Sequence, residues 1–234
     1  MGIAWETKKL VIFDVDGTLY SERLMRFFMM RELCTQVVTR PSRWTVLQQV
    51  RIFRHVHEEL AGTESAGLFA KQLELTSHRL GIEPTTVHQT VNEWMFHRPL
   101  RHLPRCCFAD LPPFIKALET SGTAVAFLSD YPCREKIEAL GLDSRNAFWT
   151  DHPAIGASKP NPNTLKRVAS QMGVDPAASL LIGDRDDRDG EAARRAGMEY
   201  LIKTRRKKTD EHCFFSYHDL LRQLNGSGSR AEKS

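Results

Sequence analysis

The sequence is poor in the features that mark secreted proteins. It has five cysteines, an odd number, and no two of them form a C-x-x-C pair. This argues against both a disulfide framework and a zinc site, and it favours reduced thiols in a reducing compartment. The first residues also lack the apolar stretch of a signal peptide. We therefore expect a cytoplasmic protein.

Long apolar runs and a strong charge of either sign are also absent. A membrane-spanning helix needs about 20 apolar residues, and the longest candidate, around Phe27 to Met30, is interrupted by Arg26 and Arg31. The formal net charge is only +4. A mildly basic chain favours an anionic substrate, but this charge is too weak to indicate nucleic acid. We expect neither a membrane nor a nucleic acid as partner.

Several short apolar runs predict buried strands of a parallel sheet, because they are continuous rather than alternating and are sharply bounded. They span residues 10–13, 124–128, 180–182 and 200–202, and a shorter run at 147–150 is a candidate for a fifth strand. Between them lie apolar positions at helical spacing. Strands that alternate with helices predict an α/β fold with a doubly wound parallel sheet.

The alternation fails between about residue 22 and residue 108, where no strand-like run occurs. Apolar positions there recur at helical spacing, and Val46, Val50 and Phe53 share one such face. We therefore predict an all-helical insertion at residues 21–108, within a core formed by residues 1–20 and 109–225. Residues 226–234 are mostly small and polar, so we expect a disordered tail there.

Polar residues follow the predicted strands at the points where ligands bind in an open α/β sheet. They are Asp14 to Thr18, Ser129 with Asp130, Lys159, and the acidic segment Asp184 to Asp189. So many carboxylates in one place would repel one another strongly without a cation, so we predict a bound divalent metal. Oxygen ligands alone point to Mg²⁺ rather than to zinc.

The segment Asp14-Val-Asp-Gly-Thr-Leu-Tyr20 resembles the first motif of the haloacid dehalogenase superfamily. Ser129, Lys159 and the segment from Asp184 resemble its other three motifs, in the same order. A surface turn with an Asx cap would explain the first motif alone, but neither the buried strand before it nor the later motifs. The resemblance implies a Rossmann-like parallel sheet of order 3-2-1-4-5. It also implies that the insertion is a type 1 helical cap, as in phosphatases similar to phosphoglycolate phosphatase.

The resemblance implies the catalytic and metal-binding roles of four aspartates. Asp14 would attack phosphorus and form an aspartyl-phosphate. Asp16 would protonate the leaving group, which requires a raised pKa that crowded carboxylates can supply. Asp14, the backbone carbonyl of Asp16 and Asp184 would bind Mg²⁺ directly, and Asp189 would support them through water. Asp187 is the alternative to Asp189 for that last role.

The resemblance also implies a phosphate-binding set. Ser129 and Lys159 would bind the phosphoryl oxygens, and Thr18 would hold the loop that carries Asp16. The alternatives are a helix N-cap for Ser129 and a solvated surface lysine for Lys159. Asp130 belongs to this set by position, but relatives often have asparagine there, so it adds negative charge beside an anionic ligand.

Substrate contacts are expected from the hinge at Tyr20 and from the insertion, where Arg98 and Arg101 are candidate leaving-group anchors. A solvated basic linker is the alternative for the two arginines. The predicted function is a Mg²⁺-dependent phosphatase acting on a small phosphorylated metabolite, as a monomer or homodimer. A phosphotransferase or sugar phosphomutase would use the same residues, and a non-catalytic phosphoacceptor is the alternative of another class. A dehalogenase is disfavoured because in that branch the position of Asp16 is not normally acidic.

Overall fold

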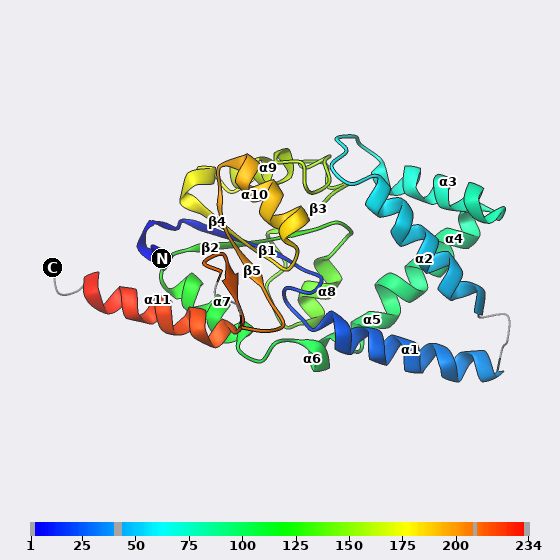
Figure 1. The fold of residues 1–234 in the computed structure, drawn as a ribbon, viewed down its shortest axis with the longest axis horizontal. Helices are drawn as coiled ribbons and strands as arrows, with labels where there is room; N and C mark the ends of the chain where they lie inside the picture. Colours follow the sequence, from blue (N-terminus) through cyan, green and yellow to red (C-terminus); the bar gives the residue numbers. More distant parts are fainter. Residues whose placement is uncertain (1–2, 40–43, 208–209, 232–234) are drawn as a thin grey trace.

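A computed structural model describes residues 3–39, 44–207 and 210–231. It consists of a core built on one sheet and a group of helices beyond the end of that sheet (Figure 1). The core elements before the last helix are η1 (Trp5–Thr7), β1 (Leu10–Asp14), α7 (Leu111–Thr120), β2 (Ala124–Ser129), α8 (Arg134–Ala139), β3 (Ala147–Trp149), α9 (Asn163–Gln171), η4 (Pro176–Ala178), β4 (Ser179–Gly183), η5 (Asp186–Gly190), α10 (Glu191–Ala196), β5 (Glu199–Lys203) and β6 (Cys213–Phe214).

The sheet has six parallel strands in the order β3-β2-β1-β4-β5-β6. The α/β class and the order 3-2-1-4-5 predicted from the sequence are confirmed, and each of the five predicted strands is present. The sixth strand was not predicted. It comprises only Cys213 and Phe214, which is too short to produce a recognisable apolar run.

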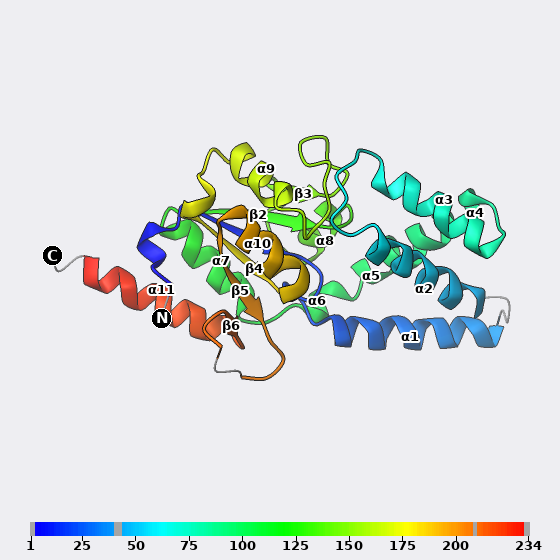
Figure 2. The same cartoon turned by 45° about the horizontal axis from the view of Figure 1, so that its top comes forward.

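Alternate residues of β1 face two separate cores, which explains why the whole strand is apolar. Val11 and Phe13 belong to one core cluster, whereas Leu10 and Ile12 belong to the other. Helices α7, α8 and α11 cover the first face, and α9 and α10 cover the second (Figures 1 and 2). Both faces of a parallel sheet are normally covered in this way, so its central strands are buried throughout.

Between β1 and α7 the regular secondary structure of the described residues is helical, as predicted, apart from two isolated bridges, and turns join the helices. We call residues 22–106 the helical insert. Its elements are α1 (Glu22–Thr39), α2 (Trp44–Glu59), α3 (Leu68–Leu80), α4 (Pro84–Val91), the π-helix η3 (Asn92–His97), α5 (Arg98–Leu100) and α6 (Leu103–Cys106). The first four helices lie beyond the carboxyl ends of the strands, opposite the chain termini (Figure 1). None of the described helices is long and apolar enough to cross a membrane.

The chain ends in helix α11 (Tyr217–Ala231), so the prediction of a disordered tail from residue 226 is wrong as far as Ala231. Residues 232–234 lie outside the described part of the chain. Tyr217, Leu220 and Leu224 are buried in the core cluster that contains α7. Once packing has fixed the first turns, each further residue adds a backbone hydrogen bond at little entropic cost, so the helix continues into the glycine- and serine-rich end.

Candidate active site

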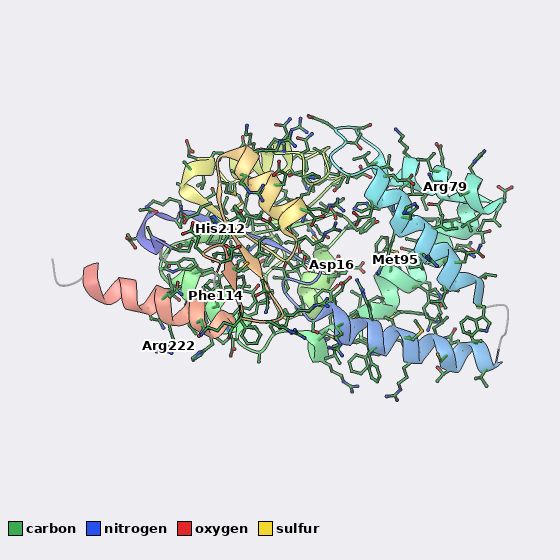
Figure 3. All side chains as sticks on the ribbon, viewed as in Figure 1. Asp16, Arg79, Met95, Phe114, His212 and Arg222 are labelled. Carbon is green, nitrogen blue, oxygen red and sulfur yellow. The ribbon has the colours of Figure 1, made fainter. Side chains whose placement is uncertain are left out.

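The polar residues that follow the central strands meet at one edge of the sheet. Asp14 ends β1, Ser129 ends β2, and Asp184 follows β4. Because β1 pairs in parallel with β2 on one side and with β4 on the other, these three ends lie next to one another. Asp16 lies at this edge and faces the helical insert, where Met95 is labelled (Figure 3).

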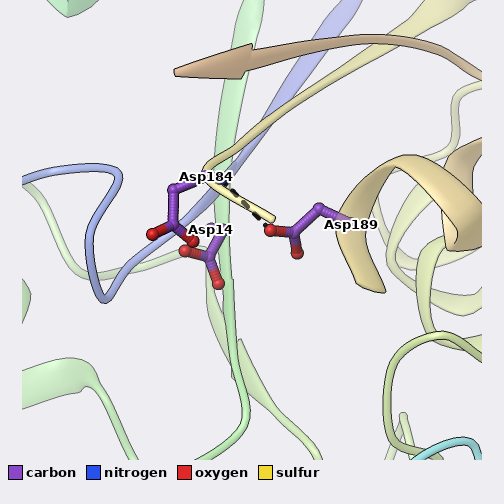
Figure 4. Close-up of side chains that lie close together, drawn as sticks. All are labelled: Asp14, Asp184 and Asp189. Carbon is purple, nitrogen blue, oxygen red and sulfur yellow. Dashed lines mark hydrogen bonds between the residues drawn. The ribbon is translucent and has the colours of Figure 1, made fainter. Parts of the chain in front are cut away.

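Three of the predicted carboxylates form a cluster. Asp14, Asp184 and Asp189 each offer an oxygen within 4.8 Å of the other two, and their side chains converge in Figure 4. Lys159 joins two of them, since its Nζ donates to Asp14 Oδ1 at 2.5 Å and to Asp189 Oδ1 at 2.7 Å. Asp187 lies elsewhere, because it is exposed and pairs with Arg185. The structure therefore brings Asp189, and not Asp187, into the cluster.

The cluster carries more negative charge than Lys159 balances. Burial, together with Asp189 and Asp184, raises the pKa of Asp14 well above its usual value, although Lys159 opposes the shift. Burial and Asp189 likewise raise the pKa of Asp184 to about 7. Within the described residues no side chain donates a hydrogen bond to the Asp184 carboxylate. Three oxygen donors with uncompensated charge fit a hard divalent cation such as Mg²⁺.

Two glycines let the backbone approach this cluster closely. Gly17 has φ of +91°, and a Cβ atom there would collide with the Asp184 carboxylate. At Gly183 a Cβ would lie 2.5 Å from the side chain of Asp189. The Asp189 carboxylate in turn accepts backbone hydrogen bonds from Asp184 at 3.2 Å and from Arg185 at 3.1 Å. The glycines therefore allow the loops after β1 and β4 to pack against the carboxylates.

The side chain of Asp16 lies outside the cluster and has its own cation. Lys136 Nζ, on α8, donates to both Asp16 oxygens at 2.7 and 2.9 Å, and the Tyr20 hydroxyl donates to one of them. Burial raises the pKa of Asp16, but Lys136 and Tyr20 outweigh it, and the pKa lies below its usual value. The expectation of a raised pKa is therefore wrong. The sequence analysis did not identify Lys136, which lies between two glutamates and resembles a solvated helix residue.

The remaining phosphate-binding candidates lie where the motifs predict. Thr18 Oγ1 donates to Asp14 Oδ2 at 2.8 Å, so it holds the aspartate itself. Ser129 is buried, and its hydroxyl accepts from the Tyr131 backbone amide at 3.3 Å. It does not cap a helix, because α8 begins only after Cys133. Lys159 is 3% exposed, which excludes the solvated surface lysine considered above.

Asp130 is held by residues that the sequence analysis did not assign to the site. Its Oδ2 lies 3.1 Å from Nε2 of His57, on α2 of the insert, and 3.6 Å from an Arg188 nitrogen. Although burial opposes ionisation, His57, Lys159 and Arg188 hold the pKa of Asp130 well below its usual value. The extra negative charge expected at this position is therefore compensated by neighbouring cations. No helical periodicity indicates the contact of His57 with the core.

These residues line one cavity of about 540 Å³ between the sheet edge and the helical insert. The predicted site residues in its lining are Asp14, Asp16, Tyr20, Ser129, Asp130, Lys159, Asp184 and Asp189. The cavity is thus bounded by charged groups on the core side and by helices α1, α2 and η3 on the other. This arrangement can bind an anion and a metal ion while covering a bound ligand with the insert.

Residues 8–197 match the model of the haloacid dehalogenase-like hydrolase family. The chain belongs to this family. The match contains all four motifs, so the predicted family is confirmed. Each catalytic candidate of this hydrolase lies within the matched span, whereas all of α11 lies beyond it.

Two curated relatives of this family member are phosphatases. Glyceraldehyde 3-phosphate phosphatase of Methanopyrus kandleri is 27% identical, over 86% of this chain and 85% of its own length. N-acetylmuramic acid 6-phosphate phosphatase of Pseudomonas aeruginosa is 26% identical, over 82% of this chain and 79% of its own length. Both agree with the predicted enzyme class, a phosphoric monoester hydrolase.

The fold has a similar relative among solved structures. A 2-haloacid dehalogenase from Pseudomonas syringae superposes with a TM-score of 0.65 at 18% identity, and it covers 95% of this chain and 99% of its own. At this level of identity the likeness shows the fold alone. The Rossmann-like architecture implied by the motifs is thereby confirmed.

The two arginines proposed as leaving-group anchors do not line the cavity of this hydrolase. Arg98 pairs with Glu32 and Glu93 and lies over the ring of Trp94, 4.5 Å from its centroid. Arg101 pairs with Glu32 at 2.8 Å. Both guanidinium groups therefore pair with carboxylates of the helical insert, where Arg98 packs on Trp94 and Arg101 is exposed.

Proposed function

We propose that this protein is a Mg²⁺-dependent phosphatase that hydrolyses a small phosphomonoester through an aspartyl-phosphate on Asp14. The observation that carries the proposal is the position of Lys159. Its ammonium group lies between Asp14 and Asp189, next to the carboxylate of Asp184, which accepts no hydrogen bond from a side chain among the described residues. An ammonium group beside a nucleophile suits a dianionic phosphoryl group, whose charge must be cancelled as it is transferred.

The chain's own residues account for the two displacements. An Asp14 oxygen bonds to phosphorus as the bond to the ester oxygen breaks. Lys136 and Tyr20 hold the pKa of Asp16 below its usual value, so Asp16 has to take up a proton as the ester binds, and it then gives that proton to the leaving oxygen. Water then attacks the aspartyl-phosphate and gives a proton back to Asp16. Phosphate leaves, and Asp14 is restored. Lys159 and Ser129 hold the phosphoryl oxygens, and Thr18 orients Asp14 through the hydrogen bond at 2.8 Å.

Mg²⁺ would be held by Asp14, Asp184 and the backbone carbonyl of Asp16, with Asp189 supporting the site through water. When bound, it would keep Asp14 and Asp184 ionised and cancel charge on the phosphoryl group. The raised pKa values of these two aspartates support this assignment, because they show carboxylates in need of a further positive charge.

We assign residues 1–20 and 109–225 to the catalytic core and residues 21–108 to a cap that covers the bound ester. Two contacts that join α2 to the core support this division, the hydrogen bond between His57 and Asp130 and the ion pair between Glu58 and Arg185. A cap that closes on the core would exclude water while phosphorus is transferred. The two phosphatase relatives are named for small phosphorylated sugars, which supports a small phosphorylated metabolite as the substrate class.

The proposal is tested with p-nitrophenyl phosphate and Mg²⁺, followed by EDTA and by the variant Asp14→Asn. We expect hydrolysis that EDTA abolishes and that Mg²⁺ restores, and no turnover in Asp14→Asn. Asp187→Asn is the matched control, since it removes an exposed carboxylate outside the cluster and should keep nearly full activity. Metal-independent turnover, or full activity in Asp14→Asn, would contradict the proposal.

A further inference from the structure

The side of the cavity formed by the helical insert is unusually apolar for a site that binds a phosphate ester. Helix α1 contributes Met29 and Leu33, α2 contributes Val46 and Val50, and η3 contributes Trp94 and Met95. The cluster aspartates and Lys159 all lie on the opposite, core side. The ester oxygen would therefore lie between the charged core side and the apolar insert side of the cavity. The insert side would contact the group that is esterified to the phosphate.

The polar residues that the insert does contribute to this cavity are largely engaged with other groups. Glu22 accepts from Arg26 at 2.6 Å, Glu58 accepts from Arg185 at 2.7 Å, and His57 lies beside Asp130. The remaining charged side chain from the insert, Arg54, is exposed. A polyhydroxylated leaving group would have to give up water at each hydroxyl without finding a partner for most of them, and each unpaired hydroxyl is costly.

The helix η3 contributes a continuous apolar and aromatic stretch to this side of the cavity. Three consecutive residues of η3, Trp94 to Phe96, line the cavity. η3 is a π-helix, a rare conformation often found at functional sites.

We propose that the cavity takes a phosphomonoester whose leaving group is an aryl group or an alkyl chain, rather than a sugar. The proposal rests on the phosphatase function and specifies its substrate class. The volume of about 540 Å³ accommodates a phosphoryl group together with a ring or a chain of similar size. The apolar side chains of the insert would favour binding of such a group by removing it from water.

The first test measures binding and needs no turnover. Calorimetry with Mg²⁺ compares 2-phenylethylphosphonic acid with methylphosphonic acid, and we expect the phenyl compound to bind about 30-fold more tightly. Met29→Gln should reduce this ratio several-fold. Met172→Gln is the matched control, because Met172 packs in the core cluster of α9 and α10, away from the cavity, and should keep the ratio. Equal affinities in the unmodified protein would overturn the proposal.

Hydrolysis rates then separate this proposal from the phosphatase function itself. 2-Phenylethyl phosphate and glucose 6-phosphate are both esters of primary alcohols, and we expect kcat/KM to be at least about tenfold higher for the phenyl ester. An equal or higher value for the sugar would overturn the assigned substrate class. If no ester is hydrolysed, including p-nitrophenyl phosphate, while the binding preference holds, the phosphatase function fails and the ligand class stands.

Discussion

Lys136 donates hydrogen bonds to both carboxylate oxygens of Asp16, at 2.7 and 2.9 Å, across 120 positions of sequence. The pair joins α8 to the loop after β1, and Lys136 is 7% exposed. A charge that is so well buried and so well paired holds its partner in one orientation. Lys136 is therefore a positioning residue for the proposed acid.

Replacing Lys136 with methionine should slow the reaction in a way that depends on the leaving group. Methionine keeps the length of the side chain but cannot orient Asp16, and a misplaced catalytic group commonly costs on the order of 10²-fold. The loss in kcat should be large for an alkyl phosphate and small for p-nitrophenyl phosphate, whose leaving group needs no proton. Steady-state kinetics with both esters measures the difference, and Lys136→Arg should recover part of the rate. An equal loss on both esters would mean that Lys136 acts on folding alone.

The close approach of Gly17 to Asp184 predicts that Gly17→Ala damages the metal site. Alanine at φ of +91° is strained, and its Cβ would collide with the Asp184 carboxylate. Gly67→Ala is the matched control, because Gly67 has φ of +75° with no atom near its absent Cβ. We expect Gly67→Ala to lower the free energy of unfolding by about 1 kcal/mol and to keep kcat. Gly17→Ala should also weaken Mg²⁺ binding, measured by calorimetry. Equal Mg²⁺ affinity in the two variants would exclude the collision.

Magnesium affinity should fall as the pH drops below neutrality. Burial and neighbouring carboxylates raise the pKa of Asp184 to about 7 and raise that of Asp14 as well. A proton therefore occupies Asp184 below about pH 7 in the metal-free protein and must leave before the metal binds, and the raised pKa of Asp14 acts in the same direction. From pH 8 to pH 6 we expect the Kd for Mg²⁺ to rise by about tenfold or more. Calorimetry in buffers of different ionisation enthalpy would count the released protons. An affinity independent of pH would show that the site does not bind the metal through these carboxylates.

The cysteines should differ sharply in reactivity towards iodoacetamide. Cys34 is exposed on α1, whereas Cys133 is fully buried and donates to the Phe148 carbonyl oxygen at 3.3 Å. Burial raises the pKa of Cys133 to about 12, so it offers almost no thiolate at pH 8. Mass spectrometry should find Cys34 alkylated within minutes and Cys133 only after unfolding in guanidinium chloride. Early labelling of Cys133 would contradict its placement under the sheet.

The strands of the core could be predicted because each is buried on both faces. Residues 10–13 alternate between two cores, so no polar residue interrupts the run, and the run itself indicates the strand. Strand β6 has only two residues and carries no such pattern. Helix α11 was cut short in the prediction because glycine and serine have low helix propensity, while its stability comes from the contact of Tyr217 and Leu224 with the core.

The site was predictable where a residue follows a strand directly. Asp14 and Ser129 each end a predicted strand and Asp184 follows one, and parallel strands bring such ends together whatever the rest of the chain does. Lys136 and His57 could not be found in this way. Each lies on a helix whose periodicity indicates only which face is apolar, and their contacts depend on how that helix packs.

The sequence alone determined the strands and the acidic edge, because these follow from local apolar runs and from the polar motifs after them, and the resemblance of those motifs to a known family supplied the strand order. Only the tertiary structure decided which cation stands beside each carboxylate, that Asp189 rather than Asp187 joins the cluster, and that Arg98 and Arg101 are neutralised away from the cavity. Whether two charges pair depends on a spatial distance of a few ångströms between segments that are far apart in sequence. Tertiary packing sets that distance, and it cannot be read from the sequence.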